Sequence, residues 1–163
     1  NLEAGRLKIE PVKVELCRFL DEIIAENRTL PAIFNTIQFI KSQEPVFIYI
    51  DRQMIREVVN NLISNACKYS TKSDPVIIKL TSKKRYAVIS FSDNGIGIPK
   101  EDDEKIFEPF HRGMNVGNIR GTGLGLTLSK EFIKAHGGDI TYSSRPEGGT
   151  TFFVTIPHKT VTA

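Results

Sequence analysis

The chain has 163 residues and a mass of 18.3 kDa, which at roughly 150 residues per domain is enough for one domain with a sizeable core. Hydrophobic residues make up 40% of the chain and charged residues 25%, and these globular proportions argue against wholesale disorder, collagen and coiled coil. The formal net charge of +3 is too small to indicate a nucleic acid partner, so we expect none.

No apolar run approaches the ~20 residues that span a membrane, and the sequence contains no recognisable signal peptide. Cys17 and Cys67 are the two cysteines of the chain, and they form no disulfide framework. A reducing compartment fits this usage best, so we expect a cytoplasmic domain, whether the parent protein is membrane-anchored or not. Because the chain begins at Asn1 rather than Met, we also expect a fragment of a longer protein.

The first segment of the chain is polar, and residues 1–10 resemble a tail or the frayed end of a preceding helix. Pro11 is tolerated in the first turn of a helix. Apolar residues then recur at helical spacing, which predicts an amphipathic helix over 12–27, ended by Thr29-Leu30-Pro31.

The middle of the chain carries the strongest helix signal. Short apolar runs predict strands at 33–40 and 46–50, separated by a polar turn. Asp51 is suited to cap the helix that follows, and an apolar face repeats over 51–69.

The remaining elements are predicted from runs of β-branched residues and from glycine punctuation. Strands are expected at 76–82, 86–92, 139–143 and 150–156, and a helix from about 124 to 136, stopped by Gly137-Gly138. Helices and strands mix without strict alternation, so we predict an α/β (α+β) two-layer sandwich with a mixed sheet.

The helix over 51–69 has an unusual polar face. Glu57, Asn61 and Asn65 follow one another at i, i+4 and i+8, and Lys68 joins the same face. Taken alone, a solvated surface is the simpler interpretation. The alternative is a magnesium–phosphate site, because Mg²⁺ takes one or two oxygen ligands from the protein and the rest from phosphates and water.

The segment Asp93-Asn-Gly-Ile-Gly-Ile-Pro99 directly follows a predicted strand. A carboxylate at a strand end, followed by two glycines, stands beside a backbone that a ligand can approach closely. Such an acceptor-only group suits an exocyclic amine. An ordinary Asx turn is the alternative, whereas a calcium loop is disfavoured because the regular oxygen spacing is missing.

A second glycine-rich segment, 121–125, opens the last predicted helix, and backbone N–H groups at a helix start bind anions. It lacks the ending of a P-loop and the glycine spacing of a dinucleotide fingerprint. The preceding stretch 113–120 has few core-forming residues and suggests a mobile lid, flanked by Arg112 and Arg120, which either reach phosphates or lie in solvent. Gly148-Gly149-Thr150-Thr151 alone reads as a hairpin turn.

Taken in order, these motifs resemble the catalytic, ATP-binding domain of sensor histidine kinases, a member of the GHKL group that shares the Bergerat fold. The resemblance runs from about residue 11 to residue 157. It is carried by the N box at 57–69, the first glycine box at 93–99, the phenylalanine box at 107–112, the second glycine box at 121–126 and the Thr-bearing element at 148–152. The fold that it implies is a mixed five-stranded sheet with three helices.

The resemblance also implies the site residues. Glu57, Asn61 and Arg112 are assigned to catalysis, and Asn65, with Asn61 beside it, to Mg²⁺. Asp93 is expected to accept from the adenine amino group, while Thr151 or Thr150 supports the adenine pocket through water. The full set expected around ATP is Asn61, Asn65, Lys68, Tyr69, Asp93, Gly95, Gly97, Ile98, Arg112, Gly121, Thr122, Gly123, Leu124, Gly125 and Thr151.

The phosphoacceptor histidine of the family lies upstream, in a helical dimerisation domain, with an acidic residue after it. The histidines here are His111, His136 and His158, followed by Arg, Gly and Lys. We therefore expect 1–10 to be the remnant of that upstream helix or a linker, 11–158 to be the ATP-binding domain and 159–163 to be a tail.

The implied function is transfer of the γ-phosphate of Mg-ATP to a histidine on the upstream domain, in two-component signal transduction. The implied partners are that dimerisation domain and a response regulator receiver domain; the isolated domain is expected to be a monomer and the parent a homodimer. Autophosphorylation is not expected from the chain alone. A non-catalytic nucleotide-sensing module, another ATPase of the superfamily and a serine kinase are the alternatives.

Overall fold

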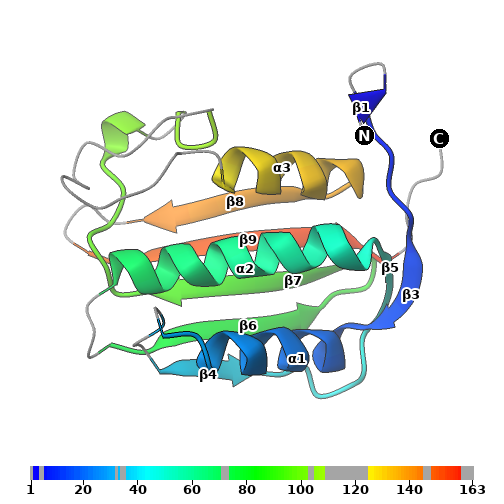
Figure 1. The fold of residues 1–163 in the computed structure, drawn as a ribbon, viewed down its shortest axis with the longest axis horizontal. Coiled ribbons are helices and arrows are strands. Elements are labelled where there is room, and N and C mark those ends of the chain that lie inside the picture. Colours follow the sequence, from blue (N-terminus) through cyan, green and yellow to red (C-terminus); the bar gives the residue numbers. More distant parts are fainter. Residues whose placement is uncertain are drawn as a thin grey trace.

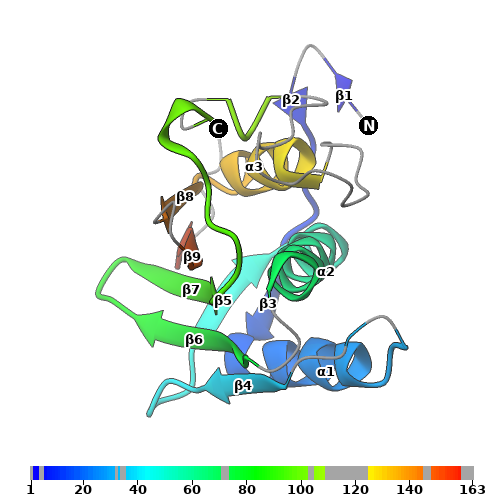
Figure 2. The same ribbon diagram turned by 90° about the vertical axis from the view of Figure 1, so that its left-hand side faces the viewer.

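The computed structural model of the chain describes residues 2–3, 6–31, 33, 36–70, 74–102, 105–108, 125–144 and 148–158. A five-stranded sheet forms one layer, and the helices cover one of its faces (Figure 1, Figure 2). The strands, in order across the sheet, are β4 (Ile37–Ile40), β6 (Val76–Ser82), β7 (Tyr86–Asp93), β9 (Thr150–Pro157) and β8 (Asp139–Ser144). The helices are α1 (Leu16–Arg28), α2 (Arg52–Tyr69) and α3 (Gly125–Ala135), with a short 3₁₀ turn at Lys100–Asp102.

The sheet is mixed, because β4 runs parallel to β6 while the other neighbouring strands pair antiparallel. The predicted two-layer sandwich of a mixed five-stranded sheet and three helices is therefore confirmed over the described residues. The strands predicted at 76–82, 86–92, 139–143 and 150–156 are also confirmed, each within one residue at either end.

The predicted start of the first helix is wrong. Val12–Glu15 is a strand, β3, which pairs antiparallel with β5 (Phe47–Ile50), so the helix predicted from residue 12 begins at Leu16. Glu15 caps this helix, since its carboxylate accepts from the backbone N–H groups of residues 17 and 18. Before Pro11, where a tail or the frayed end of a helix is predicted, two short strands, β1 (Leu2–Glu3) and β2 (Arg6–Leu7), pair antiparallel.

Helix α2 begins and ends as predicted. Asp51 is its N-cap, and its side chain accepts from the backbone N–H of Met54 at 3.2 Å. The apolar face is buried against the sheet and the other helices through Ile55, Val58, Val59, Leu62, Ile63 and Ala66. The opposite face of α2 is thereby left for the polar side chains that the sequence singled out.

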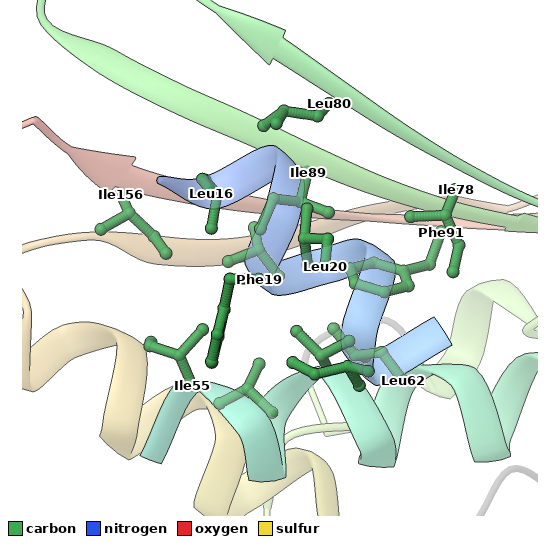
Figure 3. Close-up of a cluster of buried hydrophobic side chains, with 14 of the residues drawn as sticks. Leu16, Phe19, Leu20, Ile55, Leu62, Ile78, Leu80, Ile89, Phe91 and Ile156 are labelled. Carbon is green, nitrogen blue, oxygen red and sulfur yellow. The ribbon is translucent and has the colours of Figure 1, made fainter. Parts of the chain in front are cut away.

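The hydrophobic core lies between the sheet and the helices (Figure 3). Its largest fully buried side chains include Phe19 of α1, Leu62 of α2 and Phe91 of β7. Burying a side chain of this size stabilises the fold by about 1.5–3 kcal/mol. The core therefore fixes how the ends of α2 and β7 lie relative to each other.

At one end of the sheet, the side chains on the face that the helices cover change from apolar to polar. Along β7, β9 and β8 that face carries apolar side chains up to Phe91, Phe152 and Tyr142. The next register level holds Asp93, Thr150 and Ser144, which are neighbours because Thr150 pairs with both of the others. We call these three residues the polar row.

Candidate functional site

The polar row lies at the carboxyl end of β7, next to the segment 93–99, which we call the glycine strap. Asp93 is half-buried, and its Oδ1 accepts from the backbone N–H of Gly95 at 2.8 Å. Burial raises the pKa of Asp93 from its ordinary value of 3.8 to about 6, and backbone N–H donors at Gly95 and Thr150 oppose this rise. Asp93 is thus a carboxylate held out of water at the edge of the core.

The strap is held against the end of α2 through backbone atoms. The backbone N–H of Ile96 donates to the Tyr69 carbonyl at 3.2 Å. A Cβ at Gly95 would lie 2.1 Å from the same carbonyl oxygen, so no other residue fits there without a shift of the backbone. Gly97 has a φ of 74°, which also favours glycine.

The other side of the strap is held by the β8–β9 turn. The backbone N–H of Gly149 donates to the Gly95 carbonyl at 2.9 Å. The backbone N–H of Ile98 donates to Ser144 Oγ at 2.6 Å. The strap is therefore fixed between α2 and the turn, and it holds Asp93, Gly95, Gly97 and Ile98 of the expected site close to the polar row.

The polar face of α2 leads from the strap towards the start of α3. Asn61 and Asn65 are half-buried, whereas Glu57 and Lys68 are exposed. Asn61 Nδ2 donates to Ser129 Oγ of α3 at 3.3 Å. The Asn61 carboxamide also lies 3.7–3.9 Å from the position that a Cβ on Gly125 would take. Asn61 is thus placed beside the first residue of α3.

The two threonines of the last predicted element lie on opposite faces of the sheet. Thr150 is 5% exposed and belongs to the polar row. Thr151 pairs with Ser92, and their hydroxyl oxygens are 2.9 Å apart on the face away from the helices. The structure therefore places Thr150, and not Thr151, next to Asp93.

The described part of the phenylalanine box packs on the sheet and on α3. The ring of Phe107 lies 6.2 Å from that of Tyr142 and 6.5 Å from that of Phe152, centroid to centroid. Thr127 Oγ1 donates to the Phe107 carbonyl at 2.7 Å, and the ammonium of Lys130 lies 4.2 Å from the Phe107 ring centroid. These contacts fix the segment that leads into the predicted lid.

Part of the predicted site lies outside the described residues, namely Arg112, Gly121, Thr122, Gly123 and Leu124 together with the lid. Within the described ranges, no group of three or more His, Cys, Asp or Glu side chains could hold a metal ion. Nor is any helix in that part of the chain long and apolar enough to cross a membrane.

Comparison with known proteins decides the family. The profile described as "Histidine kinase-, DNA gyrase B-, and HSP90-like ATPase" matches residues 50–160. The chain belongs to this ATPase family. Domains of this family bind ATP, so ATP is its nucleotide, and the matched range contains both the polar face of α2 and the polar row.

Relatives of the ATPase domain are sensor kinases. The chain is 38% identical over 152 residues to the sensor histidine kinase WalK of Bacillus subtilis, covering 90% of this chain and 24% of WalK. It is 31% identical over 143 residues to the sensor protein KdpD of Escherichia coli, covering 86% of this chain and 16% of KdpD. The chain therefore spans about a quarter or less of the length of these two relatives.

A solved structure agrees with these relatives. The catalytic domain of histidine kinase ThkA superposes with a TM-score of 0.79 at 27% identity, covering 93% of this chain and 99% of that domain. The mycobacterial sensor histidine kinase MprB, at 22% identity and a TM-score of 0.79, shares the fold. The resemblance inferred from the motifs is confirmed, and the chain is an ATP-binding catalytic domain of the sensor histidine kinase type.

Proposed function

We propose that the domain binds Mg-ATP and presents the γ-phosphate to a histidine on a dimerisation domain elsewhere in the parent protein. The observation that carries this proposal is that α2 connects two ends of one site. Asp93, a half-buried acceptor, lies near the carboxyl end of α2, and Asn61 of α2 lies beside the start of α3.

The base binds at the end with the polar row. The Asp93 carboxylate accepts from the adenine amino group, because it is an acceptor that burial has stripped of water. Gly95 and Gly97 keep the strap free of side chains, so that the base approaches the backbone. Tyr69 and Ile98 belong to the same end of the site, since the Tyr69 carbonyl accepts from the strap and the Ile98 N–H donates to Ser144 of the polar row. Thr150, which pairs with Asp93, supports the base in place of Thr151.

The phosphates lie along the polar face of α2. Asn61 fits a role towards Mg²⁺, because its Nδ2 donates to Ser129 and a carboxamide oxygen is the kind of ligand that Mg²⁺ takes. Asn65, one helical turn further along, supplies a second carboxamide oxygen. When bound, Mg²⁺ neutralises charge on the triphosphate. The scarcity of clustered carboxylates in the described residues suits an ion held largely by phosphate oxygens.

Further groups of this chain act on the phosphates and on the attacking histidine. Lys68 is exposed on the same helix and reaches phosphate, as do Arg112 and the amides of 121–125. Glu57, also exposed, polarises the incoming imidazole. The histidine nitrogen forms a bond to the γ-phosphorus while the bond to the β,γ-bridging oxygen breaks and ADP leaves. Positioning and charge neutralisation supply most of the rate.

The partners follow from this chemistry. The acceptor histidine belongs to the dimerisation domain of a homodimeric parent, and a response regulator receiver domain takes the phosphoryl group from it. The catalytic domain alone is a monomer in this account.

Phosphoryl transfer to the parent's dimerisation domain, supplied separately with [γ-³²P]ATP, tests the proposal. We expect an acid-labile phosphohistidine on the supplied domain and none on this chain. Asn65→Ala should abolish the label, while Gln53→Ala, an exposed change near the start of α2, should leave it. Tight ATP binding without any transferred label would instead indicate a nucleotide-sensing module.

A further inference from the structure

Ser144 is the third member of the polar row and lies at the end of β8. Its Oγ accepts from the backbone N–H of Ile98 at 2.6 Å. The same oxygen lies 3.3 Å from the Gly149 carbonyl oxygen and 2.9 Å from Thr150 Oγ1. One hydroxyl thus joins the glycine strap, the β8–β9 turn and the neighbour of Asp93.

The chemistry of these partners limits where the hydrogens can go. A serine hydroxyl has one hydrogen to donate and two lone pairs that accept. The Ile98 N–H occupies one lone pair, and the Gly149 carbonyl, which only accepts, can take the Ser144 hydrogen. In the contact between the two hydroxyls either oxygen can be the donor; when Ser144 donates to Gly149, its remaining lone pair accepts from Thr150.

We propose that Ser144 donates to the Gly149 carbonyl and accepts from Thr150, and that as a positioning residue it thereby sets the preference of the site for adenine over guanine. Because the Thr150 hydrogen is directed at Ser144, Thr150 Oγ1 offers lone pairs to the pocket, as the Asp93 carboxylate does. Two hydrogen-bond acceptors side by side favour adenine, which has an amino group at position 6, and disfavour guanine, which has a carbonyl there. The inference rests on the proposed function, since it requires the base to lie against Asp93.

Loss of the Ser144 hydroxyl has two consequences in this account. The Thr150 hydroxyl is released and can turn its hydrogen towards a 6-carbonyl. The Ile98 N–H loses its acceptor, which loosens the strap beside the base. Binding of ATP weakens, while the penalty against GTP becomes smaller.

Calorimetric titration of the full chain with ATP and with GTP tests the inference. For Ser144→Ala we expect ATP affinity to fall about tenfold, the loss of roughly one hydrogen bond, with GTP affinity unchanged or higher. Ser144→Thr keeps the hydroxyl and should restore the preference. Ser143→Ala is the matched control, because Ser143 is exposed and pairs with Thr151 on the other face of the sheet.

An unchanged ratio of ATP to GTP affinity in Ser144→Ala would overturn the inference. This includes an equal fall of both affinities, because an equal fall is what a merely structural residue would give. Should Ser144→Ala fail to fold, Thr150→Val removes the acceptor itself and should lower the ratio in the same way; an unchanged ratio there would also overturn it. A wild-type chain that binds no ATP would contradict the proposed function instead.

Discussion

The two ends of the sandwich each bury a titratable side chain against backbone, but the proposed nucleotide site lies at one of them. At the strap end, Asp93 is half-buried and accepts from backbone N–H groups, and its carboxylate retains lone pairs for a ligand. At the opposite end, His136 is 1% exposed. Its Nδ1 donates to the Phe132 carbonyl at 2.7 Å, and its Nε2 accepts from the Asp51 backbone N–H at 3.0 Å.

The difference lies in how much hydrogen-bonding capacity remains. Both ring nitrogens of His136 have partners inside the protein, which fixes its neutral form and ties the end of α3 to the start of α2. Asp51 is also bound to the N-terminal segment, since its Oδ2 accepts from the backbone N–H of Glu10 at 3.0 Å. A buried polar group whose capacity is used up stabilises the fold, whereas one with capacity left over is available to a substrate.

The substitution Asp93→Asn should separate binding from stability most strongly. An amide offers the adenine amino group a neutral acceptor, so ATP affinity should fall about 100-fold. Stability should not fall with it. The raised pKa of about 6 shows that burying the charged carboxylate is unfavourable, and a neutral amide removes that cost. The amide also accepts more weakly from the backbone N–H groups of Gly95 and Thr150, so the net rise in the free energy of unfolding at pH 7 should be about 1 kcal/mol.

Calorimetry and urea unfolding measure both effects. Ser143→Ala, at an exposed position on the other face of the sheet, is the control for both. If Asp93→Asn lost stability and kept its ATP affinity, Asp93 would be a structural residue like His136, and the contrast between the two ends would fail.

The substitution His136→Leu should show the reverse pattern. Removing the imidazole leaves the Asp51 backbone N–H without its acceptor, so the free energy of unfolding should fall by about 2 kcal/mol. The dissociation constant for ATP should stay the same in the folded protein. His158→Leu, at a half-buried position near the chain end, should change stability by less than about 0.5 kcal/mol. A large loss of ATP affinity in His136→Leu would show that the two ends are coupled.

The pH dependence of stability should carry a smaller signature of each end. Burial lowers the pKa of His136 below its ordinary 6.5, so the unfolded chain is protonated first and stability falls as the pH drops through 6.5. The pKa of Asp93 is raised from 3.8 to about 6, so its contribution is greatest below 3.8 and is lost as the pH rises to about 6. Each of these pH dependences should disappear in the matching variant, His136→Leu or Asp93→Asn. Urea unfolding of the wild-type chain and of both variants from pH 4 to 8 measures these dependences. A free energy of unfolding that changes with pH in the opposite direction would contradict them.

Much of the fold could be predicted because its signals are local. The apolar period of α2 and its Asp51 cap are read within one helix, and both are confirmed. Strand β3 was missed because Val12 also fits the helical period of the following segment. Its true partner, β5, lies more than thirty residues away along the chain, and only the tertiary pairing decides between strand and helix.

The motifs of the candidate site could be predicted from the sequence, but the register of the strands that carry it could not. Neighbouring residues of a strand point to opposite faces, so a shift of one residue exchanges Thr150 with Thr151 beside Asp93. Ser144 carries no local signal at all. It becomes part of the site only because β8 pairs with β9 at Thr150 and because the strap folds back onto it.

Amide chemical shifts of the ¹⁵N-labelled chain, followed as Mg-ATP is added, test most directly whether only the strap end is built to bind. We expect large shifts at Gly95, Gly97 and Thr150 and along α2 near Asn61 and Asn65, with little change at Asp51 and His136. Shifts concentrated at Asp51 and His136, with the strap unchanged, would contradict it.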